Sequence, residues 1–162
     1  MAKKSEALDE RTEMEADHAE PRVYELGFHI DPELPTEEVK KVYQGLRSKI
    51  ADTAEVVAEG EPQKIQLAYT ISRSETAGRR DFDASYFAWV AYESNGEGHD
   101  AIQAAARAES RIFRFIDLRT TKEGAQHAAE MHEIMAKAAI KEELEEEVSD
   151  VEIDAALKEV EV

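Results

Sequence analysis

The sequence has no cysteine among its 162 residues. That absence excludes disulfide bonds and thiolate metal sites, and it fits a reducing compartment. No apolar run approaches the roughly 18 residues that a membrane-spanning helix needs. The first twenty residues also lack the apolar segment of a signal peptide. We therefore expect a cytoplasmic protein that does not associate with a membrane.

Positive charge is also scarce, with 20 Lys and Arg against 37 Asp and Glu and a net charge of −17. Such acidity ordinarily argues against nucleic-acid binding. The charge is uneven, however: residues 1–20 carry −4, residues 122–162 carry −9, and the long middle segment 21–121 carries only −4. Exposed charges more than about 8–10 Å apart are screened, so a local basic patch in the middle segment can still bind phosphate.

The charge and hydropathy patterns divide the chain into three parts. Residues 1–20 are polar, have no sustained apolar period, and are predicted to be disordered. Residues 21–121 hold the apolar periodicity of a folded domain. Residues 122–162 are rich in Ala and Glu and predict an acidic tail that is helical or mobile.

Apolar residues alternate along four segments of the middle part, which predicts strands. The first covers 23–30. The second begins at 56–57, is interrupted by "EGEP", and continues through "KIQLAYTIS", with its odd-numbered residues facing inward. A loop over 73–84 follows, then strands over 85–92 and 111–120. In the last strand the expected core residues are Ile112, Ile116 and Leu118.

Two helices separate these strands. The first starts near Pro35 and has one apolar stripe, and the second covers 99–109. The stripe of the first helix consists of Val39, Val42, Tyr43, Leu46 and Ile50. The order strand, helix, strand, strand, helix, strand predicts an α+β, ferredoxin-like split βαβ sandwich. Its four antiparallel strands would carry both helices on one face.

The other face of the sheet would then be open. Four aromatic residues are expected there, and an exposed aromatic cluster marks a partner surface. Alternatively, the C-terminal extension folds back over this face. The four residues are Phe87, Trp89, Phe113 and Phe115.

No arrangement of residues suggests catalysis, a cofactor or a metal. His127 and His132 are five apart, whereas metal ligands on one helix face prefer a spacing of four. His29 and Glu25 lack a nucleophile and a third orienting group. "NGEG" lacks the glycine–lysine–hydroxyl ending of a phosphate loop and is not expected to open a helix directly from a strand.

Arginines are more informative, because guanidinium groups offer forked donors to phosphate. Arg22 opens the first strand, and Arg119 closes the fourth, so the two can approach each other at one edge. The other candidates follow the second strand or lie along the fourth: Arg73, Arg79, Arg80, Arg111 and Arg114. Alternatively, these arginines pair with the acidic residues Glu25, Asp81, Asp83 and Asp117.

The segments "YELGFHI", "QLAYTIS", "SYFAWVAYE" and "IFRFIDLR" carry a family resemblance. In order and spacing they resemble the four strands of bacterial small-subunit ribosomal protein six, over about residues 22–120. The resemblance implies a ferredoxin-like fold without catalysis. It also implies binding to the central domain of small-subunit ribosomal RNA, together with small-subunit ribosomal protein eighteen.

The resemblance places RNA contacts at Arg22, Lys64, Arg114 and Arg119, to which we add the nearby Arg73 and Arg111 as candidates. The chain departs from the family where Ile65 and Gln66 replace common basic residues, and where Thr70 replaces a common proline. The alternative function is a non-ribosomal regulatory or dimerisation module that binds a small molecule, because this fold hosts many functions.

Overall fold

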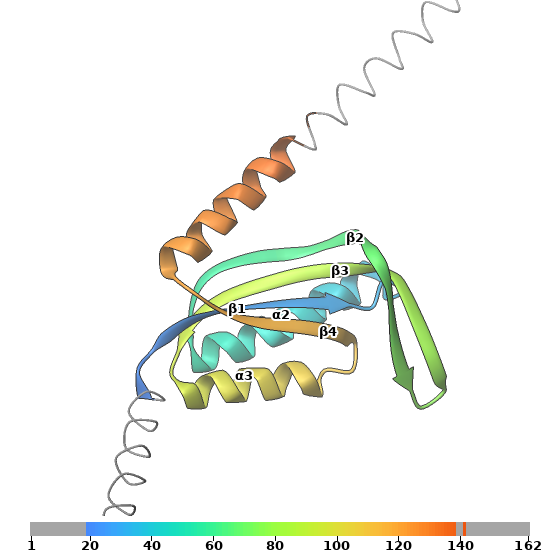
Figure 1. Cartoon of the computed structure of the whole chain (residues 1–162), viewed down its shortest axis with the longest axis horizontal. Helices are drawn as coiled ribbons and strands as arrows, with labels where there is room; N and C mark the ends of the chain where they lie inside the picture. The colour runs from blue at the N-terminus through green and yellow to red at the C-terminus, as the bar shows by residue number, and fades with distance from the viewer. Residues whose placement is uncertain (1–18, 139–140, 142–162) are drawn as a thin grey trace, which may run out of the picture. The chain divides into compact units, whose positions relative to one another are not determined.

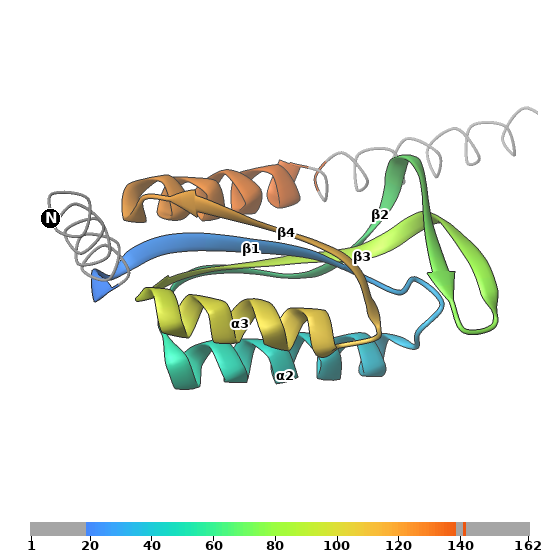
Figure 2. The same ribbon diagram turned by 60° about the horizontal axis from the view of Figure 1, so that its bottom comes forward.

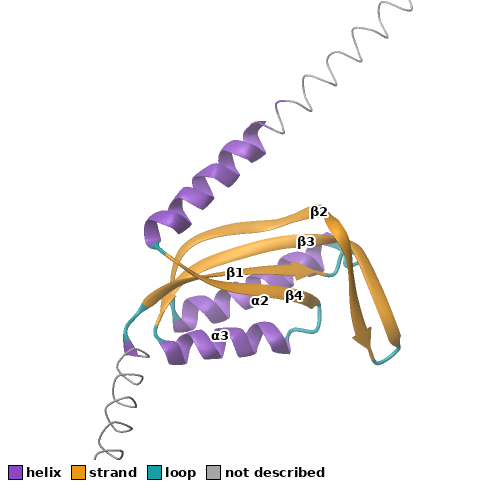
Figure 3. Cartoon of the chain, viewed as in Figure 1, coloured by secondary structure: helices purple, strands orange, loops and turns teal. Residues whose placement is uncertain are grey.

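The computed structural model describes residues 19–138 and residue 141 (Figure 1). Most of the expected extension 1–20 and of the expected tail 122–162 therefore lies outside the described residues. The secondary structure is drawn in Figure 3. Its labelled elements are β1 (Arg22–Ile30), α2 (Thr36–Thr53), β2 (Glu55–Glu75), β3 (Gly78–Ser94), α3 (Gly96–Ala108) and β4 (Ile112–Thr120).

The four strands form one antiparallel sheet in the order β2-β3-β1-β4. Helices α2 and α3 lie together on one face of this sheet (Figure 2). This element order and strand order confirm the α+β, ferredoxin-like split βαβ arrangement. Because β1 and β3 are central, β2 and β4 are the two edge strands.

The core lies between the helices and one face of the sheet. Strand β1 contributes the fully buried Leu26, Phe28 and Ile30. All five residues of the predicted α2 stripe are buried, so that prediction is confirmed. The residues of β3 opposite the β1 core positions, Ala88 and Val90, are fully buried as well.

The predicted core face of β4 is wrong beyond Ile112. The pairing shifts between His29, which faces Arg114, and Ile30, which faces Ile112. Phe113 is therefore an extra residue, and one extra residue sends every later side chain to the other face. As a result Ile116 and Leu118 are 57% and 50% exposed on the face away from the helices, hereafter the open face.

Strand β2 is longer and more irregular than its pattern predicts. "EGEP" does not end the strand but forms a bulge, in which residues 61 and 62 lie opposite the single residue 88. Proline is tolerated at such a position because it has no N–H to give to the ladder. A larger bulge, residues 67–70, lies opposite Asp83, whose carboxylate and carbonyl accept hydrogen bonds from Thr70 and Gln66.

The predicted loop 73–84 is also wrong, since this segment is a tight hairpin. Residues 71–75 of β2 pair with residues 78–82 of β3, and Glu75 lies opposite Gly78, whose φ is +126°. We call residues 71–82 the hairpin arm; it bends away from the rest of the sheet (Figure 1). Arg73 and Arg80 lie directly opposite each other in the arm. Like charges so placed repel, and each guanidinium instead bonds to groups outside the arm.

The "NGEG" segment opens a helix directly from a strand, contrary to expectation. Strand β3 ends at Ser94, and α3 begins at Gly96. The side chain of Asn95 accepts a hydrogen bond from the N–H of Gly98 at 2.9 Å, which caps the helix.

Residues 122–138 are helical, which confirms a partly helical tail as far as the chain is described. The hydroxyl of Thr121 accepts a hydrogen bond from the N–H of Gly124 and so caps this helix. The helical residues from His127 on form a unit separate from the sheet domain. Among the described residues, no helix is long and apolar enough to cross a membrane.

Candidate nucleic-acid interface

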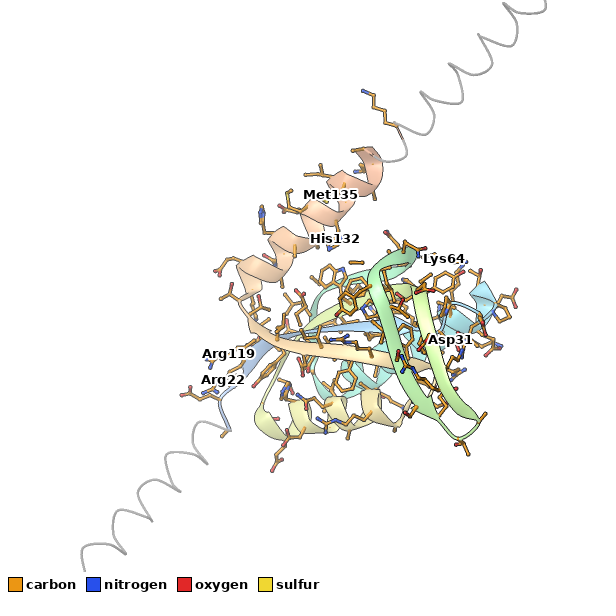
Figure 4. All side chains as sticks on the ribbon, turned by 45° about the vertical axis from the view of Figure 1, so that its right-hand side comes forward. Arg22, Asp31, Lys64, Arg119, His132 and Met135 are labelled. Atoms are coloured by element: carbon orange, nitrogen blue, oxygen red, sulfur yellow. The ribbon has the colours of Figure 1, made fainter. Side chains whose placement is uncertain are left out.

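Five of the six predicted RNA-binding cations gather along the edge strand β4. Arg73 and Arg111 lie at its start, because Arg73 bonds to the carbonyl of Ile112. Arg114 lies within the strand. Arg119 lies at its far end near Arg22, since the neighbouring pairs are Tyr24 with Arg119 and Val23 with Thr120 (Figure 4). Lys64 is apart from them, on the opposite edge strand β2.

Two of these cations are used inside the domain. Arg73 donates to the carbonyls of Ser110 and Ile112 at 3.0 and 3.3 Å, which ties the hairpin arm to the start of β4. The guanidinium of Arg111 makes two hydrogen bonds to Glu109 and one to Glu38, and the N–H of Arg111 donates a third to Glu109. The hydrogen bonds from Arg111 hold the pKa of Glu109 below its ordinary value. Neither guanidinium can turn wholly to a phosphate without giving up a structural contact.

The two further arginines of the arm are also paired. Arg79 contacts Asp81 at 3.0 Å, as the ion-pairing alternative predicted. Arg80 donates to both oxygens of Asp31 and to Glu33. Burial alone would raise the pKa of Asp31, but the hydrogen bonds from Arg80 and the N–H of Glu33 hold it below its ordinary value.

Arg114 and Arg119 remain as exposed cations of β4. Arg114 donates one hydrogen bond, to the hydroxyl of Tyr69 at 3.2 Å. Arg119 makes no hydrogen bond or ion pair with any other residue that the structure describes. Being five positions apart, they point to opposite faces and are separated by about 17 Å along the strand. One ligand can reach both only by running along the strand edge.

A pocket of about 330 Å³ opens beside Arg114 on the open face. We call it the arm pocket, because the 67–70 bulge and the base of the hairpin arm form one of its walls. Strands β1 and β4 form the other. Its lining residues are His29, Leu67, Ala68, Tyr69, Ile71, Arg114, Phe115 and Ile116.

His29 is the polar residue in the wall formed by β1. Its Nδ1 lies 2.7 Å from the hydroxyl oxygen of Ser85, which is fully buried. Its ring lies between those of Phe87 and Phe113, with centroid distances of 5.2 and 5.7 Å. Burial, and then the positive charge of Arg114, lower the pKa of His29. The imidazole is therefore neutral at neutral pH.

The four aromatic residues expected on the open face do not form one surface. Trp89 is on that face but only 4% exposed, and Phe87 is half-buried beside it. Phe113 stacks on Phe82 of the arm at a centroid distance of 4.0 Å. Phe115 turns to the helix side and packs against the core because of the Phe113 bulge.

Of the residues that line the arm pocket, Arg114 and Phe115 were candidates from the sequence, whereas Leu67, Tyr69 and Ile71 were not expected at a site. The alternation of "KIQLAYTIS" assigned Leu67, Tyr69 and Ile71 to the core, yet Tyr69 is 63% exposed and the other two are half-buried. The family-like "LAY" segment was the available signal. Its alternation correctly grouped these side chains on one face but did not show that a bulge would lift them over the open face.

A buried polar cluster lies on the helix side of the sheet. The side chain of Asp117 is only 5% exposed and accepts hydrogen bonds from Gln103 at 2.9 Å and Tyr92 at 3.4 Å. Its other oxygen is buried without a hydrogen-bond partner among the described residues. Burial outweighs these hydrogen bonds and raises the pKa of Asp117. The ring of His99 lies 3.4 Å from Asp117, whereas the ion-pairing alternative expected an arginine beside this carboxylate.

No protein-family model and no curated protein sequence matches the chain. Among solved structures, the chain is similar to the 30S ribosomal protein S6 of Thermotoga maritima, with a TM-score of 0.49 and 17% identity over 73% of this chain and 99% of that one. It is also similar to an uncharacterized protein of Thermotoga maritima, with a TM-score of 0.36 and 9% identity over 63% of this chain and 100% of that one. Neither likeness assigns the chain to a family.

Proposed function

We propose that the protein is a structural constituent of the small ribosomal subunit and not an enzyme. In this proposal it binds the central domain of small-subunit ribosomal RNA together with small-subunit ribosomal protein eighteen. The pairing with protein eighteen rests on the sequence resemblance alone.

The observation that carries the RNA part of the proposal is which of the cations along the β4 edge are exposed and which are held by other groups of the domain. Arg114 and Arg119 are exposed on an edge strand, while Arg73 and Arg111 are held by internal contacts. Exposed guanidinium groups keep their charge and offer forked donors, which suits phosphate oxygens. RNA running along the β4 edge would meet Arg114 first and Arg119 about 17 Å further on, a distance of a few nucleotides.

Lys64 is a weaker candidate for an RNA contact. It lies on the opposite edge of the sheet, with its ammonium 5.9 Å from the centroid of the Tyr86 ring. The neighbouring Ile65 and Gln66 supply no further charge. A lone exposed lysine adds little binding energy compared with two arginines on one strand.

Binding of a central-domain RNA fragment, with protein eighteen present, tests this proposal over a range of salt concentrations. Arg114→Ala and Arg119→Ala should each weaken binding and reduce the slope of log affinity on log salt by about one unit. The matched control is Arg79→Ala, which removes an arginine that is already paired with Asp81. Its slope should be unchanged.

Sedimentation of cell lysate separates the proposal from its alternative. Co-migration with small ribosomal subunits at moderate salt supports a ribosomal role. A free homodimer that binds no RNA would overturn it in favour of the regulatory or dimerisation module. Full RNA binding by the Arg114→Ala, Arg119→Ala double variant would overturn the assignment of the site.

A further inference from the structure

We infer that the arm pocket holds a single unpaired nucleotide of the bound RNA, with its phosphate at Arg114 and its base against the apolar wall. This inference deepens the proposed function and rests on it. The proposed function needs only phosphate contacts along β4. The arm pocket adds a recessed site beside one of those contacts.

The size and lining of the pocket suit a nucleobase. Its volume of about 330 Å³ is at the lower end of the roughly 300–1,000 Å³ that small-molecule sites occupy. Leu67, Ile71 and Ile116 give it an apolar wall, and no acidic side chain lines it. Unstacked RNA bases are recognised by packing their faces on such surfaces and on aromatic rings.

Arg114 gives the pocket a positive charge. One of its nitrogens donates to the hydroxyl of Tyr69, and a guanidinium has five N–H donors, so donors remain for a phosphate oxygen. The net charge of −17 opposes any anion at long range, so the bound group must be held by close contacts. A nucleotide satisfies this condition because its base and its phosphate are parts of one molecule, so both can make close contacts at the same site.

His29 is suited to read the edge of a base. Its Nδ1 is engaged with Ser85, and Nε2 has no partner among the described residues. The ring is neutral, because burial and Arg114 lower its pKa. Depending on which nitrogen holds the proton, Nε2 can either donate to or accept from a base, and it adds no charge that would favour a carboxylate.

Tyr69 lies on the 67–70 bulge, lines the pocket and is 63% exposed. Exposed aromatic rings bind RNA by stacking, and loss of such a ring typically costs about tenfold to a hundredfold in affinity per base. An apolar peptide side chain would also fit the wall, but it would leave the guanidinium of Arg114 without an anion. A nucleotide matches the apolar, cationic and hydrogen-bonding groups together.

The test uses a central-domain RNA fragment substituted with 4-thiouridine, the full chain and protein eighteen. Tyr69→Ala should weaken binding at least tenfold without changing the salt slope, because it removes a ring and not a charge. Tyr69→Phe keeps the ring and should stay within threefold of the wild type. Leu118→Ala, an exposed open-face residue outside the pocket, should also stay within threefold. Illumination should cross-link the RNA to residues of the pocket lining.

The outcomes separate this inference from the proposed function. Normal binding by Tyr69→Ala, together with a reduced salt slope for Arg119→Ala, would overturn the nucleotide site and leave the proposed function standing. Cross-links from the RNA that are confined to other surfaces of the chain, or to protein eighteen, would overturn the nucleotide site as well. If the wild-type chain binds no RNA, both proposals fail.

Discussion

Replacing Arg80 by alanine should destabilise the domain by releasing the hairpin arm. The guanidinium makes two hydrogen bonds to Asp31, one of them 2.8 Å long, and one of 2.7 Å to Glu33. It also lies 4.6 Å from the centroid of the Phe82 ring. The side chains of Arg80 and Asp31 are only 29% and 17% exposed, so water replaces these contacts poorly.

The magnitude follows from this partial burial. A hydrogen bond to a charged group contributes about 1.5–3 kcal/mol, and breaking a fully buried ion pair costs about 3–5 kcal/mol. Glu33 is 79% exposed and adds little. We expect Arg80→Ala to lower the free energy of unfolding by about 2–3 kcal/mol, which corresponds to a fall in Tm of about 10 °C.

Urea unfolding at 25 °C and neutral pH measures this loss, with Arg79→Ala as the matched control. Arg79 is 70% exposed in its pair with Asp81, so its loss should cost under about 0.5 kcal/mol. An Arg80→Ala loss as small as that of the control would refute the role of Arg80 in holding the hairpin arm. In a double-mutant cycle with Asp31→Asn, the double variant should lose much less unfolding free energy than the sum of the two single losses.

The same contact predicts a pH dependence. The pKa of Asp31 is lowered in the folded state, so its contribution to stability is present above the unfolded value of about 3.9. The contribution is lost as pH falls through the folded pKa. The difference in stability between wild type and Arg80→Ala should therefore shrink below about pH 4, and a difference that is constant down to acid unfolding would contradict this cause.

Four further substitutions test the packing and the buried carboxylate. Gly60→Ala would place a Cβ 2.1 Å from Nε1 of Trp89 and should cost about 1–3 kcal/mol, whereas Gly45→Ala, with no atom within 4 Å, should stabilise α2 by up to about 1 kcal/mol. Leu67→Ala should cost less than the roughly 2–5 kcal/mol of a core leucine, and a core-sized loss would show that it is core. Because burial raises its pKa, Asp117 costs stability as pH rises above about 4. In urea unfolding, the stability of Asp117→Asn relative to wild type should therefore increase as pH rises from about 4, and a constant difference would refute this.

Where the hydrophobic pattern was regular, the sequence predicted the fold well. The stripe from Val39 to Ile50 is buried as expected, and the alternating residues Leu26, Phe28 and Ile30 of the predicted first strand are fully buried on one face. These patterns are local, because the period of a helix or strand fixes which residues share a face. The order of the six elements then left the split βαβ arrangement as the expected one.

The prediction failed where two strands lose register. No local feature of β4 marks Phe113 as an extra residue, yet it moves Ile116 and Leu118 from the expected core to the open face. The bulge at 67–70 similarly turns an expected core strand into the wall of a pocket. A bulge depends on what the partner strand offers, so the sequence of one strand does not reveal it.

The candidate site, too, was predicted in part from the sequence and decided in part by the tertiary structure. The sequence alone showed that the acidity is concentrated in residues 1–20 and 122–162. It also showed that the predicted fourth strand carries several arginines. Only the tertiary structure decided which of the candidate cations are already used. Arg73 is held by the distant Ser110 and Arg111 partly by the distant Glu38, whereas Arg114 and Arg119 remain exposed. A charge is visible in the sequence, but its partner is set by the folding of distant segments onto one another.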